Sequence, residues 1–221
     1  MPKLTFTVGS TRSGKSTYVK EWEYEQRMKY NRAVVINEDK IRLAVHGQRY
    51  AGRAEGIVQA MTLVFIRAML ESGYDVLYDE TNTSLDSIRA IFEINPEAEP
   101  VLFLADLQTL YDRAKHTQQE DLVTGGVIDR HCGQLYKLSN HKFCPPKVPG
   151  VYSYPDLYKM YVDSSCESRV ELMSDRIIAP PPKTYTVYSN AALYDQQVKQ
   201  NKNEFKQKIL KGIEEIRKEF Q

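Results

Sequence analysis

A short segment near the N-terminus, Gly9-Ser10-Thr11-Arg12-Ser13-Gly14-Lys15-Ser16, limits the fold of this chain more than any other feature. It matches the pattern GxxxxGK[ST] at every fixed position, and it lies between a short apolar run and a stretch of helix-forming residues. Glycines let the backbone wrap closely around an anion, and the amide groups of such a loop favour phosphate. The segment therefore predicts a phosphate-binding loop between a strand and a helix, as in P-loop NTPases.

The same loop predicts ATP and Mg²⁺ as ligands. A lysine at the position of Lys15 reaches the β- and γ-phosphates, and a hydroxyl at the position of Ser16 ligates the metal ion. The residues that we expect to contact the nucleotide are Gly9, Ser10, Thr11, Arg12, Ser13, Gly14, Lys15, Ser16 and Thr17. Motors, switches and kinases all use this loop, so other residues have to separate these functions.

Apolar runs that alternate with helical patterns predict an α/β fold. Strands are expected at residues 4–8, 33–36, 75–78 and 101–104, and helices at 14–29 and 56–71. The short, continuously apolar strands are typical of a parallel sheet covered on both faces. We therefore predict a doubly wound, mainly parallel sheet with helices on both faces and a C-terminal extension.

The pattern changes after about residue 140, so we predict two parts. We expect residues 1–140 to form the domain of the phosphate loop, including a lid, and 141–221 to form an extension rich in tyrosine and proline that ends in an amphipathic helix. One face of that helix carries Phe205, Ile209, Ile213, Ile216 and Phe220. This face packs on the core or binds a partner, and we expect the first.

Composition narrows the class of protein further. The chain has 221 residues, 42% of them hydrophobic and 27% charged, which is typical of a globular protein. No stretch approaches the roughly 20 apolar residues that a membrane span needs, and three cysteines are too few for a disulfide framework. We expect a cytoplasmic protein with no membrane partner. The net charge of +1 allows contact with a strand end or a single nucleotide but does not indicate a protein that coats nucleic acid.

Asp39 and Arg42 follow the second predicted strand, at the sheet edge where ligands bind in open α/β folds. Three positions apart, they share a face of a helix that begins there. A carboxylate here accepts a proton from an attacking hydroxyl, and a guanidinium holds an acceptor phosphate or the migrating phosphoryl group. The alternative is that Asp39 caps the helix and Arg42 is a solvated charge.

Two further groups of charges follow later strands. Asp79 and Glu80 end the third strand, and we expect one of them to bind the Mg²⁺ water shell or the acceptor, with Thr81-Asn82 starting the next helix. In an ATP-hydrolysing motor or regulatory ATPase, Glu80 polarises water instead. The third alternative is a helix cap, with Asn82 or Ser84 supplying it. The basic segment around Arg113 is interpreted as a lid over the triphosphate, or as a solvated face.

Taken in order, these motifs resemble the 5′-hydroxyl polynucleotide kinases of phage and repair enzymes over about residues 4–140. The shared elements are the phosphate loop, an Asp-x-x-Arg after the second strand, an Asp-x-Thr-Asn after the third and a basic lid. The resemblance implies ATP and Mg²⁺ as cofactors, a nucleic acid as acceptor and four catalytic residues, which are Lys15, Asp39, Arg42 and Arg113. Asp39 is then the general base and Arg113 a lid arginine on the donor phosphates.

The resemblance leaves some assignments open. Asp79 matches the family's Asp-x-Thr-Asn, whereas some relatives have the acid at the position of Glu80; Ser16, Asp79 and Glu80 are therefore the candidate metal residues. Thr117 stands where the family often has a second lid arginine. We expect transfer of the γ-phosphoryl group to a 5′-hydroxyl end. The alternative acceptor is a 5-hydroxymethyl group on a pyrimidine within phage DNA, as in some relatives, or another small hydroxyl compound.

Overall fold

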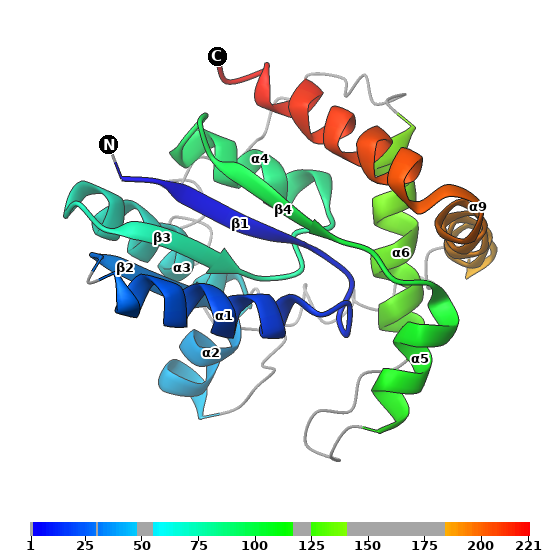
Figure 1. Cartoon of the computed structure of the whole chain (residues 1–221), viewed down its shortest axis with the longest axis horizontal. Helices are drawn as coiled ribbons and strands as arrows, with labels where there is room; N and C mark the ends of the chain where they lie inside the picture. Colours follow the sequence, from blue (N-terminus) through cyan, green and yellow to red (C-terminus); the bar gives the residue numbers. More distant parts are fainter. Residues whose placement is uncertain (1, 30, 48–54, 117–124, 141–183) are drawn as a thin grey trace, which may run out of the picture.

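The computed structural model describes residues 2–29, 31–47, 55–116, 125–140 and 184–221, and a parallel four-stranded sheet lies at its centre (Figure 1). The strands are β1 (Leu4–Gly9), β2 (Ala33–Asn37), β3 (Asp75–Asp79) and β4 (Glu99–Phe103), in the spatial order β2-β3-β1-β4. β1 thus lies between β3 and β4, and Phe6 is in register with both Tyr78 and Pro100. The predicted α/β fold is confirmed.

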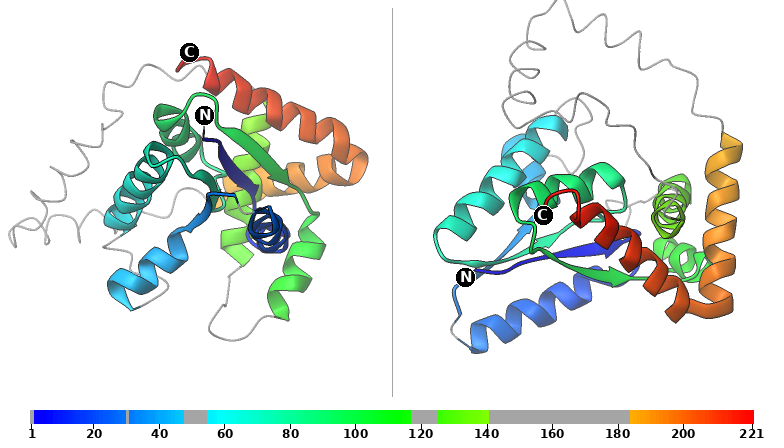
Figure 2. Two further views of the ribbon diagram at one scale, coloured as in Figure 1. Left: turned by 60° about the vertical axis from the view of Figure 1, so that its left-hand side comes forward. Right: turned by 90° about the horizontal axis from the view of Figure 1, so that it is seen from above.

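Helices cover both faces of this sheet, as expected. They are α1 (Lys15–Met28), α2 (Glu38–His46), α3 (Glu55–Glu71), α4 (Leu85–Ile94), α5 (Leu107–Lys115), α6 (Gly125–Ser139) and α9 (Thr184–Arg217). Figure 2 shows α1 on one face and α3 and α4 on the other. The connection that leaves β1 runs to β2, whereas the connection that leaves the neighbouring β3 runs the opposite way, to β4. This reversal creates a switch point at the carboxyl ends of the strands, where ligands bind in such sheets.

Side-chain caps fix where several helices begin at that edge. Asn37 caps α2 by accepting a hydrogen bond from the Lys40 amide at 3.1 Å, so Asp39 is not the cap of this helix. Ser84 caps α4 by accepting from the Ser87 amide at 3.1 Å. The prediction that Thr81-Asn82 starts α4 is wrong, because the serine three positions after Thr81 satisfies the first free amides.

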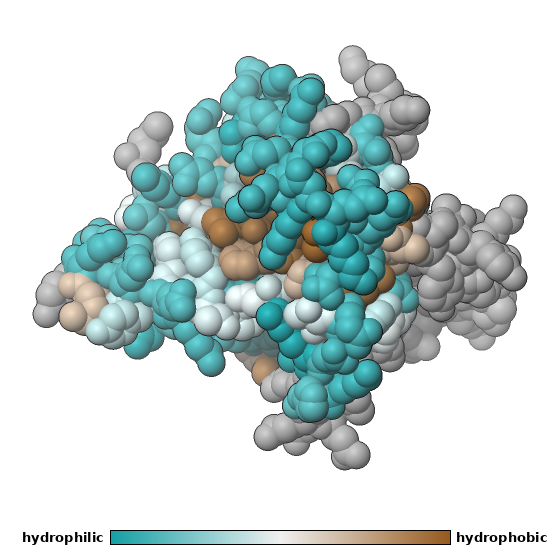
Figure 3. Space-filling model, turned by 45° about the vertical axis from the view of Figure 1, so that its right-hand side comes forward, coloured by the Kyte–Doolittle hydropathy of each residue, from teal (hydrophilic) through white to brown (hydrophobic). Residues whose placement is uncertain are grey.

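The C-terminal helix α9 packs on the same hydrophobic core as the sheet. Tyr194, Phe205, Ile209 and Ile213 are at most 1% exposed, and the expected docking of the amphipathic helix is confirmed. The helix bends at Asn201, which has non-helical backbone angles and caps the second half by accepting from the Glu204 amide at 3.1 Å. Hydrophilic residues dominate the surface on this side, with an apolar strip between them (Figure 3).

Within the described part of the chain, none of the helices is both long and apolar enough to cross a membrane.

Candidate active site

The phosphate loop joins β1 to α1 and contains two glycines with positive φ angles. Other residues adopt this backbone conformation only with strain. Gly9 has a φ of 158°, and a Cβ atom at this position would lie only 2.6 Å from the Phe103 carbonyl oxygen. Gly14 has a φ of 107° and immediately precedes α1. The loop amides and the N-terminus of a 14-residue helix therefore face the same edge of the sheet. An anion that binds there meets amide donors from the backbone.

Lys15 is folded back onto this loop. Its Nζ donates to the carbonyl oxygens of Gly9 at 3.0 Å and Ser10 at 2.8 Å. Burial lowers the pKa of Lys15 to about 8, and the nearby charge of Glu80 opposes this shift. The charges of Asp79 and Asp39 act in the same direction as that of Glu80. The loop lysine is thus surrounded by the carboxylates that the sequence singled out.

The end of β3 carries two carboxylates with different surroundings. Asp79 is buried, and its Oδ2 accepts from Asn37 Nδ2 at 3.0 Å. Thr7 Oγ1 of the neighbouring β1 lies 3.5 Å from the other oxygen of Asp79 and 2.7 Å from the Glu80 carbonyl oxygen. Burial, reinforced by the charge of Glu38, raises the pKa of the Glu80 side chain to about 7. Asp79 is therefore held in place by two strands, whereas Glu80 turns toward the acidic groups of α2.

The predicted pair of Asp39 and Arg42 does lie on one face of α2, but Arg42 has three acidic partners. Its NH1 donates to Asp39 Oδ1 at 2.6 Å, and its NH2 donates to Glu38 at 2.9 Å. Its Nε and NH2 also donate to Glu55 of α3, at 2.9 and 2.7 Å. Arg42 is only 12% exposed, whereas the Asp39 side chain is 62% exposed. Asp39 is therefore accessible, and Arg42 connects α2 to α3.

A polar pocket of about 320 Å³ lies where β2 and β3 end. Its acidic lining comes from three elements, since Glu38 belongs to α2, Glu55 to α3 and Glu80 follows β3. Tyr78 of β3 also lines the pocket, and its hydroxyl donates to Glu38 at 2.5 Å. The rest of the lining is made of hydroxyl, amide and basic side chains: Gln59, Thr81, Asn82, Thr83, Ser84, Ser87, Arg130, His131 and Gln134. The arrangement suits a ligand that is rich in hydrogen-bond donors.

Two residues of this pocket make contacts with β1 or the phosphate loop that the sequence did not predict. Asn82 has a φ of 43°, donates to the Thr7 carbonyl oxygen at 2.9 Å, and is 2% exposed. Its Oδ1 is buried without a hydrogen-bond partner among the described residues. His131 of α6 accepts from the Thr11 amide of the phosphate loop at 3.4 Å, and burial lowers its pKa to about 3. A histidine 120 positions away from the loop gives no local sequence signal.

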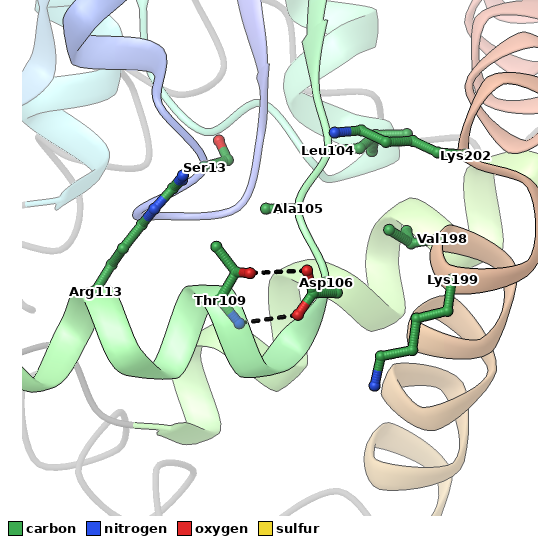
Figure 4. Close-up of a pocket in the computed structure, with 9 residues that line it drawn as sticks. All are labelled: Ser13, Leu104, Ala105, Asp106, Thr109, Arg113, Val198, Lys199 and Lys202. Carbon is green, nitrogen blue, oxygen red and sulfur yellow. Dashed lines mark hydrogen bonds between the residues drawn. The ribbon is translucent and has the colours of Figure 1, made fainter.

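The predicted lid arginine reaches the other side of the phosphate loop. Arg113 of α5 donates to the Arg12 carbonyl oxygen at 2.9 Å. It also lines a second pocket, of about 410 Å³, together with Ser13 of the loop (Figure 4). The loop therefore separates two pockets, one at the ends of β2 and β3 and one beside β4.

The fold and the loop define a P-loop nucleotide-binding protein. The family model described as "AAA domain" (AAA_33) matches residues 4–131, which is more than half of the chain, and the chain belongs to this family.

Solved structures similar to this chain include two of a Pnkp1/Rnl/Hen1 complex. One is described as "Structure of the Pnkp1/Rnl/Hen1 RNA repair complex", with a TM-score of 0.54 and 25% identity over 62% of this chain and 44% of the other. The second, "Structure of Pnkp1/Rnl/Hen1 complex", has a TM-score of 0.46 and 25% identity over 56% and 43% of the two chains. This chain thus spans less than half the length of the chains it matches. Comparison with curated proteins gave no match.

The residues present fit ATP with Mg²⁺. Ser16 is exposed in the first turn of α1, and Asp79 lies near Lys15. These groups offer only oxygen ligands, and Mg²⁺ in such sites is held by one or two protein oxygens together with phosphates and water. The ion would neutralise charge on the phosphates.

Proposed function

We propose that this protein transfers the γ-phosphoryl group of ATP to a hydroxyl group of a polynucleotide. The observation that carries the proposal is the polar pocket beside the loop lysine. Glu80 belongs to this pocket, and its charge acts directly on Lys15. A hydroxyl compound held there meets the end of a triphosphate that is bound on the loop. The likeness to an RNA repair complex supports a polynucleotide as the acceptor.

The proposed chemistry needs few groups, because phosphoryl transfer depends mainly on positioning and on stabilising charge. Lys15 and the loop amides hold the phosphates. Asp39 is next to Glu38 but is not itself among the residues that line the pocket. We assign it the proton of the attacking hydroxyl because its 62% exposure leaves it open to an incoming strand. Arg42 orients Asp39 through their 2.6 Å ion pair, and Arg113 holds the donor side of the loop.

The first acceptor to test is a 5′-hydroxyl end. The lining of the pocket also favours a second candidate, a 5-hydroxymethyl group on a base within DNA. Three of the lining residues are acidic, and Arg130 is the one cationic side chain among the described residues of the lining, because burial lowers the pKa of His131 to about 3. Arg42 compensates the charges of Glu38 and Glu55, which leaves Glu80 as the acid that disfavours a phosphate next to the reacting hydroxyl. An uncharged base is not disfavoured in this way. A base inside a duplex would have to be flipped out to reach the pocket.

Transfer of radioactive γ-phosphate from ATP separates these candidates. The acceptors are 5′-OH DNA, 5′-OH RNA and DNA that contains hydroxymethyluracil. Label on a strand end supports the first candidate, and label on an internal base supports the second. Free phosphate without labelled acceptor contradicts the proposal and supports an ATPase in which Glu80 activates water.

Replacing the loop lysine tests the donor side. We expect Lys15→Ala to reduce transfer by roughly 10²–10³-fold, since a single preorganised donor to developing charge has about this effect. Lys20→Ala, on the exposed side of the same helix, is the matched control and keeps full activity. Both variants should unfold at the wild-type temperature. An active Lys15→Ala variant would contradict the assignment of the loop.

A further inference from the structure

The pocket beside β4 is built from the phosphate loop and from the C-terminal helix together. Ser13 of the loop contributes to its lining, and so do the segment that follows β4 (Leu104, Ala105 and Asp106), helix α5 (Thr109 and Arg113) and helix α9 (Val198, Lys199 and Lys202). In Figure 4 the side chain of Lys202 extends from α9 toward the end of β4, and Arg113 extends from α5 toward Ser13. The family match ends at residue 131, so α9 lies outside the matched region.

The strand order determines which part of ATP this pocket faces. β1 and its loop lie between β3 on one side and β4 on the other. If the acceptor occupies the pocket at the ends of β2 and β3, the γ-phosphate must point that way. The nucleoside, at the opposite end of the triphosphate, then lies on the β4 side. This step rests on the proposed function.

The pocket has the size and chemistry that a nucleoside requires. Its volume of about 410 Å³ is within the range of small-ligand sites. Leu104, Ala105 and Val198 provide apolar surface for the face of a base. Lys199 and Lys202 each carry an ammonium group, which donates to ring nitrogens and ribose oxygens, both of them acceptors. Ser13 Oγ, also in the lining, is buried without a hydrogen-bond partner among the described residues.

We propose that α9 forms one wall of the donor-nucleoside site, with Lys199 and Lys202 binding the base or ribose of ATP. The C-terminal extension is then part of the nucleotide site rather than an appendage to it. Asp195 holds Lys199 through a 2.7 Å ion pair within α9, and Asp195 Oδ1 also accepts from the Leu107 amide at 2.8 Å. This contact fixes α9 to the first turn of α5, so both walls of the pocket keep their spacing.

The test measures binding to the full-length protein without an acceptor. In a Lys199→Ala/Lys202→Ala variant, we expect the Kd for ATP to rise about tenfold, the typical effect of losing a hydrogen bond from a charged group. The Kd for inorganic tripolyphosphate should change by less than about twofold, because the phosphate loop is intact.

The matched control is Lys206→Ala/Lys208→Ala. These lysines are exposed on the same helix, one of them is paired with an acid four positions earlier, and neither lines the pocket. The proposal would be overturned if ATP binding weakened equally in both double variants. It would also be overturned if the binding of ATP and of tripolyphosphate weakened equally in Lys199→Ala/Lys202→Ala. Because these readouts need no phosphoryl transfer, they separate failure of this proposal from failure of the proposed function.

Discussion

At the scale of single residues, the exposed carboxylate of Asp39 is the group on which the proposed transfer depends most. We expect Asp39→Asn to reduce turnover by roughly 10²–10⁴-fold, the usual effect of a positioned general base, with little change in ATP affinity. Steady-state kinetics with a saturating acceptor measures this. Asp86→Asn is the control, since Asp86 is an exposed acid in the first turn of α4. If Asp39→Asn turned over normally and Glu80→Gln were inactive, Glu80 rather than Asp39 would be the general base.

His131 makes the stability of the protein sensitive to acid. Burial lowers its pKa from 6.5 to about 3, so between these values the unfolded chain binds a proton that the folded protein does not. Stability therefore falls as the pH drops through this window, by about 2 kcal/mol between pH 6.5 and about pH 5. In His131→Asn this loss should disappear, while the amide oxygen still accepts from Thr11. Urea unfolding at the two pH values measures the difference, and an unchanged pH dependence in the variant would contradict the expectation.

The sequence predicted the donor side of the site better than the acceptor side. The phosphate loop is contiguous, so one segment was enough to place Lys15 at the end of β1. The partners of Arg42 could not be anticipated, because Glu55 lies on another helix and only packing brings it to α2. His131 was missed for the same reason. Contacts between distant helices leave no spacing pattern in the chain.

At the scale of elements, α9 contributes large side chains to the core. Phe205 is 1% exposed and meets the Tyr194 ring edge-on, with centroids 5.5 Å apart. We expect Phe205→Ala to cost about 3–5 kcal/mol, as for other buried aromatic residues. Leu193→Ala is the control, because Leu193 on the same helix is 39% exposed. Chemical denaturation checks both variants, and a loss below about 1 kcal/mol for Phe205→Ala would show that α9 detaches readily.

Element boundaries were predicted less well than the elements themselves. β4 starts at Glu99 rather than at Val101, so it includes Pro100. A proline is tolerated here because β4 is the edge strand of the described sheet. Only the second half of α9 showed a clear apolar face in the sequence. The first half became recognisable from the burial of Ala191, Tyr194 and Val198.

At the scale of the whole molecule, the division near residue 140 stays a prediction that truncation tests. A chain that ends after Asn140 loses the contacts that Phe92 and Ala98 make with α9. Arg217 lies over the Phe92 ring, 5.1 Å from its centroid, and donates to the Ala98 carbonyl oxygen at 2.6 Å. We expect this shortened chain to lack a cooperative thermal transition. Calorimetry measures the thermal transitions of the shortened and the full chain. A sharp transition of the shortened chain, within a few degrees of that of the full chain, would establish residues 1–140 as an independent domain.

The internal hydrogen bonds of the phosphate loop also determine how nucleotide affinity should be interpreted. The Lys15 ammonium group and the Thr11 amide already have acceptors inside the protein, in the Gly9 and Ser10 carbonyl groups and in His131. An arriving phosphate exchanges one set of partners for another, so a measured affinity is the difference between two well-bonded states. Substitutions that weaken the internal set, at His131 for example, are thus able to tighten nucleotide binding without touching the nucleotide.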